Sequence, residues 1–69
     1  MPSAVIRGLS YDEVTRTLFV TFTSGDLYAY LEVPPATYAE FRGAFSKGRF
    51  FAKRIRDQFA YRQLDEAGH

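Results

Sequence analysis

Apolar and polar positions alternate along the first half of the chain, and this alternation predicts β-strands. The clearest case is residues 17–23, in which every residue except the leucine is β-branched or aromatic. The apolar positions on one face of this strand are Leu18, Val20 and Phe22. Residues 4–11 predict an earlier strand with irregular spacing, so we expect a bulge or a register change near Gly8.

Residues 26–32 alternate again and predict a third strand that returns antiparallel to the second. The dipeptide Ser24-Gly25 predicts a two-residue hairpin turn between them, because glycine supplies the positive φ that tight turns need. With this turn, the residues expected on the core face are Leu27, Ala29 and Leu31. Tyr28 and Tyr30 are then expected together on the opposite face, beside Phe19.

Two helices are predicted in the second half of the chain, after Pro34 and Pro35 end the third strand. In residues 36–45, the apolar stripe expected to face inward is Tyr38, Phe41 and Phe45. Ser46 predicts the N-cap of a second helix that reaches about residue 58. Its inward set is predicted as Phe51, Ile55 and Phe59, and its outward set as Arg49, Lys53 and Arg56.

The predicted fold class is therefore α+β: a three-stranded antiparallel β-meander followed by two short α-helices packed on the sheet. Tyr61 and Leu64 are expected to add a short closing contact. We expect a single domain over residues 1–64 and a disordered C-terminal tail over residues 65–69.

Composition argues against catalysis. The 69 residues include seven Phe and five Tyr but no Cys, so a thiol nucleophile and disulfides are excluded. The only histidine is the last residue, and neither the carboxylates nor the glycines have the spacing of a catalytic or phosphate-binding motif. We expect no enzymatic activity, no metal and no cofactor. No apolar signal-like stretch opens the chain, which predicts a soluble cytoplasmic protein without a membrane partner.

Charge is strongly segregated along the chain. Residues 1–41 carry two basic and five acidic side chains, a net charge of −3, whereas residues 42–62 carry seven basic and one acidic, a net charge of +6. This asymmetry points to an anionic partner more than the overall charge of +1 does. The residues predicted to bind it are Lys47, Arg49, Lys53, Arg54 and Arg56. A second interpretation stays open, in which these cations form only a solvated helix face.

Tyr28 and Tyr30 are the second candidate feature. Two exposed aromatic rings on one strand form a platform on which unpaired bases stack. The alternative is that the helices cover this face, which makes both tyrosines part of the core. The decisive geometry is whether these tyrosines are exposed on the same side as Arg49 and Lys53.

The order of several motifs resembles that of the KTSC domain, found at the C-terminus of some lysyl-tRNA synthetases and as a stand-alone bacterial protein. The resemblance covers roughly residues 3–62. The motifs are Ser3-Ala4-Val5-Ile6 with Tyr11-Asp12, residues 18–22 with Ser24-Gly25, Tyr28-Ala29-Tyr30, Val33-Pro34 with Tyr38, and residues 46–56. It implies no catalytic residues, and the synthetase attachment implies an RNA partner, tRNA included.

The sequence thus predicts a non-enzymatic binding module for RNA or another polyanion, acting through its basic helical segment. The alternative function is a protein–protein interaction domain that uses an exposed sheet edge or associates with itself. The sequence does not fix the oligomeric state.

Overall fold

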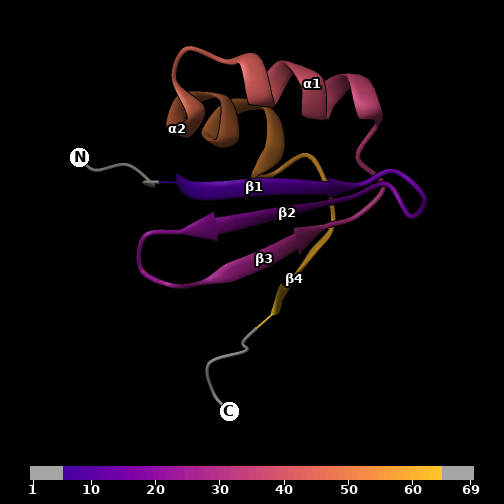
Figure 1. Ribbon diagram of the computed structural model, residues 1–69, viewed down its shortest axis with the longest axis horizontal. Helices are drawn as coiled ribbons and strands as arrows, with labels where there is room; N and C mark the ends of the chain where they lie inside the picture. Colours follow the sequence, from indigo (N-terminus) through magenta and orange to yellow (C-terminus); the bar gives the residue numbers. More distant parts are fainter. Residues whose placement is uncertain (1–5, 65–69) are drawn as a thin grey trace.

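A computed structural model describes residues 6–64 as a four-stranded antiparallel sheet with its helical segments together on one side (Figure 1). The strand order is β1-β2-β3-β4, so each strand pairs with its neighbour in the sequence. The elements are β1 Ile6–Asp12, β2 Thr17–Phe22, β3 Leu27–Tyr30, α1 Pro35–Gly43, α2 Lys47–Phe50, the π-helix η1 Phe51–Ile55 and β4 Tyr61–Leu64. The predicted tail, residues 65–69, lies outside the described residues.

The α+β class is confirmed, but the prediction of three strands is wrong. Residues 61–64 form a fourth strand that pairs antiparallel with β3, placing Tyr61 opposite Tyr30 and Leu64 opposite Leu27. Three of its four residues are exposed. Backbone pairing therefore holds this edge strand more than burial does, and its residues show little of the apolar alternation that predicts a strand.

The register between β2 and β3 reverses the predicted faces of β3. Leu18 pairs with Tyr30 and Val20 with Tyr28, so both tyrosines share the core face of the sheet. The prediction that Leu27, Ala29 and Leu31 lie on the core face is therefore wrong. Ala29 is nevertheless buried, on the other face of the sheet opposite Phe19.

The cause of this reversal is the length of the hairpin loop. Phe22 donates its backbone N–H to the carbonyl of Asp26, and Gly25 donates to the carbonyl of Phe22, which leaves residues 23–25 as a three-residue loop. A two-residue turn would have shifted the pairing by one residue. Because side chains alternate with a period of two, such a shift exchanges the two faces of a strand. Gly25 has φ of 101°, the positive value expected for the glycine of this loop.

The bulge predicted near Gly8 is confirmed, because the pairing of β1 with β2 shifts register between Ile6 and Gly8. Residues 4 and 5 of the predicted first strand lie outside the described part of the chain.

Helix α1 begins at Pro35 in its first turn, as predicted, and buries Phe41 completely. It ends at Gly43, and Ala44 takes an extended conformation with φ of −67° and ψ of 141°. Phe45 therefore leaves the helical stripe, and its side chain is fully exposed, at 105% relative accessibility. Its predicted inward position is wrong because the helix stops before the stripe reaches it.

The second helical segment also departs from prediction. Ser46 is the N-cap, as predicted: its Oγ accepts a hydrogen bond from the backbone N–H of Arg49 at 3.3 Å. The α-helical part covers only four residues, and the chain continues as the five-residue π-helix η1 and then a turn. The helical segment therefore ends at Ile55 and does not reach the predicted residue 58. Phe51 and Ile55 are buried, as predicted, whereas Phe59 is half-buried beyond the helical residues.

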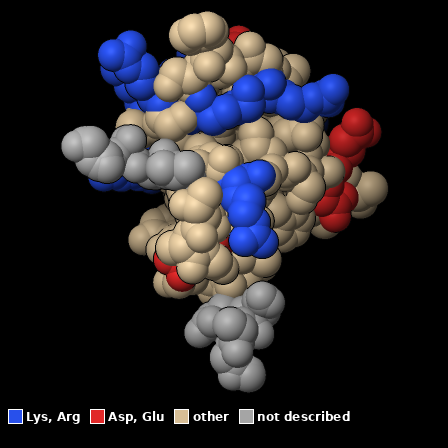
Figure 2. All heavy atoms as spheres, turned by 60° about the vertical axis from the view of Figure 1, so that its left-hand side comes forward, with Lys and Arg blue, Asp and Glu red and all other residues tan. Residues whose placement is uncertain are grey.

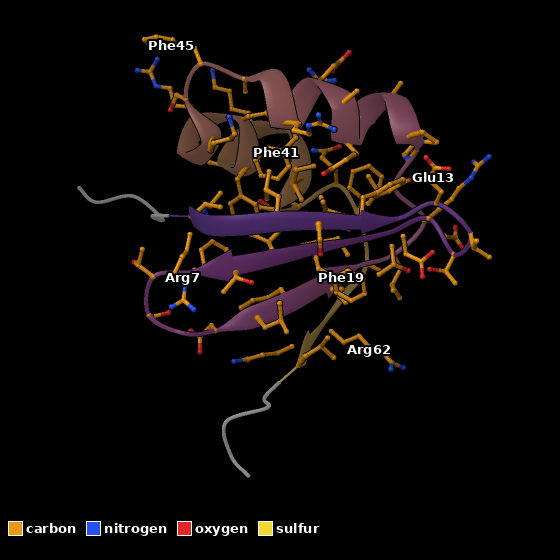
Figure 3. All side chains as sticks on the ribbon, viewed as in Figure 1. Arg7, Glu13, Phe19, Phe41, Phe45 and Arg62 are labelled. Atoms are coloured by element: carbon orange, nitrogen blue, oxygen red, sulfur yellow. The ribbon has the colours of Figure 1, made fainter. Side chains whose placement is uncertain are left out.

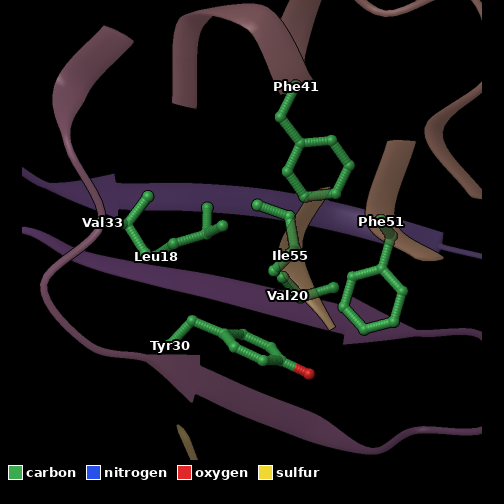
Figure 4. Close-up of a cluster of buried hydrophobic side chains, with 7 residues drawn as sticks. All are labelled: Leu18, Val20, Tyr30, Val33, Phe41, Phe51 and Ile55. Atoms are coloured by element: carbon green, nitrogen blue, oxygen red, sulfur yellow. The ribbon is translucent and has the colours of Figure 1, made fainter. Parts of the chain in front are cut away.

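The core lies between the helical segments and one face of the sheet, and Figure 4 shows its side chains converging there. Its fully or nearly fully buried members are Leu18, Val20, Tyr30, Val33, Phe41, Phe51 and Ile55. Among the described residues, no helix is long and apolar enough to span a membrane.

Candidate nucleic-acid interface

A π-helical turn divides the predicted row of cations into two groups. The backbone N–H of Arg56 bonds to the carbonyl of Phe51 five residues earlier, at 2.9 Å, instead of the four of an α-helix. One extra residue in a turn rotates the residues after it by about 100° relative to an uninterrupted α-helix. Arg49 and Lys53 therefore line one hollow of the surface and Arg56 lines another.

The first group surrounds two phenylalanine rings. Arg49, Lys53 and Arg54 line a shallow hollow of about 390 Å³ together with Phe45 and Phe50. We call these five residues the basic–aromatic surface. Figure 3 shows Phe45 pointing away from the body of the molecule at the loop between α1 and α2, whereas Phe41 points toward the sheet. Figure 2 shows a band of basic side chains across the helical end of the molecule, with acidic side chains at the margins of the view.

The cations of this surface differ in whether they already contact other side chains. Arg54 donates to Glu40 at 2.9 Å, and its guanidinium carbon lies 5.1 Å from the centre of the Phe50 ring. Both partners of this ion pair are about half exposed, at 54% and 55% of the side chain, so it contributes about 0–1 kcal/mol. Within residues 6–64, the side chains of Arg49 and Lys53 make no hydrogen bond or ion pair.

The side chain of Lys47 is hydrogen-bonded within the fold. Its Nζ donates to the carbonyl of Ala44 at 3.0 Å, just after the last residue of α1, where a cation complements the helix dipole. The backbone N–H of Arg49 is likewise already bound, to Ser46. The start of this short helical segment is therefore occupied by its own cap, and anion binding there is not supported.

The second group is a cluster of three tyrosines beside Arg56. Tyr28, Tyr30 and Tyr61 have ring centroids 5.5 to 6.2 Å apart. They line a pocket of about 300 Å³ with Arg56 and Asp57. We call these five residues the tyrosine pocket. Tyr30 is only 3% exposed, while Tyr61 is 56% exposed.

The tyrosines and the cations Arg49 and Lys53 therefore do not form one joint platform. Tyr28 and Tyr30 line a different hollow from Arg49 and Lys53, and the ring of Tyr30 is buried in the core. The alternative interpretation, that these tyrosines belong to the core, is confirmed for Tyr30, and Tyr28 is half-buried against the core. Of the predicted residues, Arg49, Lys53 and Arg54 come together, and Arg56 joins the tyrosines.

Sequence reasoning missed Phe45, Phe50 and Tyr61. The helical periodicity places Phe45 in the buried stripe of the first helix, and it places Phe50 or Ala52 beside the inward set of the second. The available signal was Gly43, because a glycine near the end of a helical stripe marks the point where the chain leaves the helix. Tyr61 was missed because the fourth strand was missed.

Burial raises the pKa of Tyr30 from 10.0 to about 12, with smaller upward contributions from Tyr28, Tyr61 and Asp57. Arg56 opposes this shift by favouring the phenolate. The Tyr30 hydroxyl therefore stays protonated at neutral pH and is available as a hydrogen-bond donor.

The sequence and the fold both match a known family. The sequence profile of the KTSC domain matches residues 2–59. The chain belongs to the KTSC domain family. A crystal structure of a KTSC domain protein from Yersinia pestis superimposes with a TM-score of 0.84 at 36% identity, covering 94% of this chain and 92% of that one.

Some relatives are much longer than this KTSC domain, and others are similar to it in length. A lysine–tRNA ligase of Nostoc punctiforme is 41% identical over 61 residues, which are 88% of this chain but 11% of the ligase. The chain thus spans about a tenth of the length of the ligases it matches. An uncharacterised protein of Stutzerimonas stutzeri is 36% identical over 66 residues and similar in length, with 94% of this chain and 93% of that protein covered.

Proposed function

We propose that this KTSC domain is a non-enzymatic module that binds single-stranded segments of RNA through its basic–aromatic surface. The observation that carries the proposal is that the exposed ring of Phe45 shares one hollow with Arg49 and Lys53. Proteins that bind single strands combine cations that follow the phosphates with aromatic rings on which bases stack. In this proposal the aromatic rings beside the cations are those of Phe45 and Phe50, and not those of the tyrosines.

The energetics of folding do not account for these side chains. A fully exposed Phe45 adds nothing to the core, and Arg49 and Lys53, which make no ion pair within residues 6–64, repel each other slightly. Both features are explained if a ligand covers the ring and neutralises the charges. A polyanion with flat bases has both properties.

Relatives suggest which RNA to test first. Some relatives are lysine–tRNA ligases by name, so tRNA is the first candidate. The proposal includes a cytoplasmic location and an action by binding alone. In support of the latter, the chain has no Cys and its single His is the last residue, so it offers no thiol nucleophile and only one imidazole base.

Fluorescence anisotropy with a labelled single-stranded RNA and with tRNA, at low and at physiological salt, tests the proposal. We expect binding at low salt that weakens steeply as salt rises. Phe45→Ala should lower the affinity for single-stranded RNA by about 1–3 kcal/mol without changing the unfolding midpoint. Absence of binding at low salt would overturn the proposal.

Val14→Ala is the matched control for Phe45→Ala. Val14 is also a strongly exposed apolar side chain, at 91%, but it lies in the turn between β1 and β2. Its truncation should leave RNA affinity unchanged. Equal losses in the two variants would show that the ring of Phe45 has no specific part in binding.

A protein partner is the second candidate, favoured by the exposed backbone edge of β4 in the described chain. An extended segment of a partner, or a second copy, would add a strand there. Size-exclusion chromatography over a concentration series, and capture from lysate after nuclease treatment, separate this candidate from RNA binding. A partner that survives nuclease and is lost on Gln63→Pro in β4 would favour it.

A further inference from the structure

The hydroxyl of Tyr30 is the feature that the fold leaves unexplained. A buried tyrosine hydroxyl usually has a hydrogen-bond partner. Tyr11 obeys this rule, because its hydroxyl donates to the carbonyl of Val33 at 2.5 Å. Tyr30 is only 3% exposed, yet within residues 6–64 its hydroxyl has no partner, and no side-chain oxygen there is both fully enclosed and unpaired. The hydroxyl must therefore open onto the pocket that it lines.

Figure 4 shows this arrangement directly: the ring of Tyr30 lies among the core side chains, and its hydroxyl points out of the cluster on the Phe51 side. Tyr28 and Tyr61 flank the same ring, with centroids 6.2 and 5.5 Å from it. Within residues 6–64, neither of their hydroxyls has a hydrogen-bond partner. Three phenols of the tyrosine pocket thus retain their capacity to bind a ligand.

The hydrogen-bond donors of the pocket, more than its net charge, suit an anion. Arg56 lies on its wall, and its effect on the Tyr30 hydroxyl exceeds that of Asp57. The carboxylates at this pocket are Asp57 and Asp26, and the oxygens of Asp26 accept hydrogen bonds from Ser24 at 3.1 Å and from Gln63 at 3.5 Å. A guanidinium beside phenol hydroxyls forms a set of donors, which suits phosphate oxygens.

Size and shape restrict the ligand further. The pocket volume of about 300 Å³ is at the lower end of small-molecule sites, about 300–1,000 Å³. The rings of the three tyrosines pack against each other too closely to admit a planar group between them. Tyr61 is 56% exposed, so one base can stack on the exposed part of its ring.

We propose that the tyrosine pocket is a separate binding site for a single nucleotide, with its phosphate on Arg56 and its base against Tyr61. The hydroxyls of Tyr28 and Tyr30 donate to the oxygens of the same ligand. This site does not depend on the basic–aromatic surface, with which it shares no lining residue. The π-helical turn that rotates Arg56 toward the tyrosines fits this role, since such turns are frequent at functional sites.

An NMR titration of the full chain with the four ribonucleoside 5′-monophosphates tests the proposal. We expect shifts of the ring signals of Tyr28, Tyr30 and Tyr61 that saturate at millimolar nucleotide or below. Tyr30→Phe, which keeps the ring and removes only the hydroxyl, should weaken binding about tenfold. Arg56→Gln should abolish the preference for a nucleotide over its unphosphorylated nucleoside.

Matched controls are available in the chain. Tyr38→Phe removes a tyrosine hydroxyl elsewhere, and Arg62→Gln removes an exposed arginine from β4. Neither should alter nucleotide binding, and neither should Arg49→Gln combined with Lys53→Gln, which separates this site from the proposed RNA surface.

Three results would overturn the proposal. The first is the absence of any shift at millimolar nucleotide. The second is a set of shifts confined to Phe45 and Phe50, which would place the nucleotide on the other surface. The third is binding of tetramethylammonium but no nucleotide, which would identify the pocket as a cation-binding aromatic site.

Discussion

The rings of Tyr11 and Tyr38 lie nearly parallel, with their centroids 4.7 Å apart and their planes 9° from each other. This contact joins the edge strand β1 to α1. The hydroxyl of Tyr11 also donates to the carbonyl of Val33, a fully buried residue between the sheet and α1. Tyr11 of the edge strand therefore contacts both α1, through Tyr38, and the segment that leads to α1, through Val33.

Removal of the Tyr11 hydroxyl should lower the free energy of unfolding. Tyr11→Phe keeps the stacked ring but deprives the Val33 carbonyl of its donor, which should destabilise the domain by about 0.5–1.5 kcal/mol. Urea unfolding followed by circular dichroism measures the change. Tyr38→Phe is the control and should stay within about 0.5 kcal/mol of the parent. Equal losses in both variants would show that the hydrogen bond to Val33 contributes nothing.

Replacing Gly25 and replacing Gly43 by alanine should change the free energy of unfolding in opposite directions. Gly25 has φ of 101°, and a Cβ there would meet no atom within 4 Å, so Gly25→Ala should destabilise by about 1–2 kcal/mol through backbone strain alone. Gly43 ends α1 with equally open space and an ordinary φ. Gly43→Ala should therefore stabilise by about 0.4–1 kcal/mol. Thermal unfolding of the two variants checks both signs, and a neutral Gly25→Ala would contradict the strained loop.

High pH should lower the free energy of unfolding in a way that depends on Tyr30. Burial holds the pKa of Tyr30 at about 12, above the 10.0 of a free tyrosine, so the unfolded chain loses this proton first. The free energy of unfolding should be unaffected by this group below pH 10.0 and fall as pH rises toward 12. Absorbance of the phenolate measures the late titration, and Tyr30→Phe should remove it. An unchanged titration in that variant would assign the late phenol to another tyrosine.

The salt dependence of RNA binding should depend on Arg49 and Lys53, which make no ion pair within the described residues. For single strands, each neutralised phosphate contributes about 0.7 to the slope of log affinity against log salt. Arg49→Gln combined with Lys53→Gln should reduce this slope by about 1.4. Arg16→Gln combined with Arg62→Gln removes the same charge from the turn after β1 and from β4, and should leave the slope unchanged. Equal reductions would indicate net charge instead of a defined surface.

Much of the fold could be predicted from local patterns. The strands β1 and β2, the bulge near Gly8, the proline start of α1 and the Ser46 cap each depend on a few adjacent residues, and each is confirmed. The strand β4 was not predicted, because hydrogen bonds to β3 define it more than its own sequence does.

The site was harder to predict because two one-residue effects decide it. The hairpin loop has three residues where two were predicted, and this difference places Tyr28 and Tyr30 on the core face of the sheet. The π-helix adds one residue to a turn, and this places Arg56 beside those tyrosines. Patterns of charge and hydropathy tolerate a shift of one position, so they identified the basic segment but not the neighbours of each cation.

The extra residue of η1 also bears on how such domains diverge. Because Phe51 and Ile55 fill the core on either side of it, the register of the buried face is maintained while the exposed face is rotated. A single insertion or deletion in this turn would redistribute the cations between two surfaces without replacing any core side chain. In relatives that share the same buried residues, the length of this one turn would decide which of the two proposed sites each cation joins.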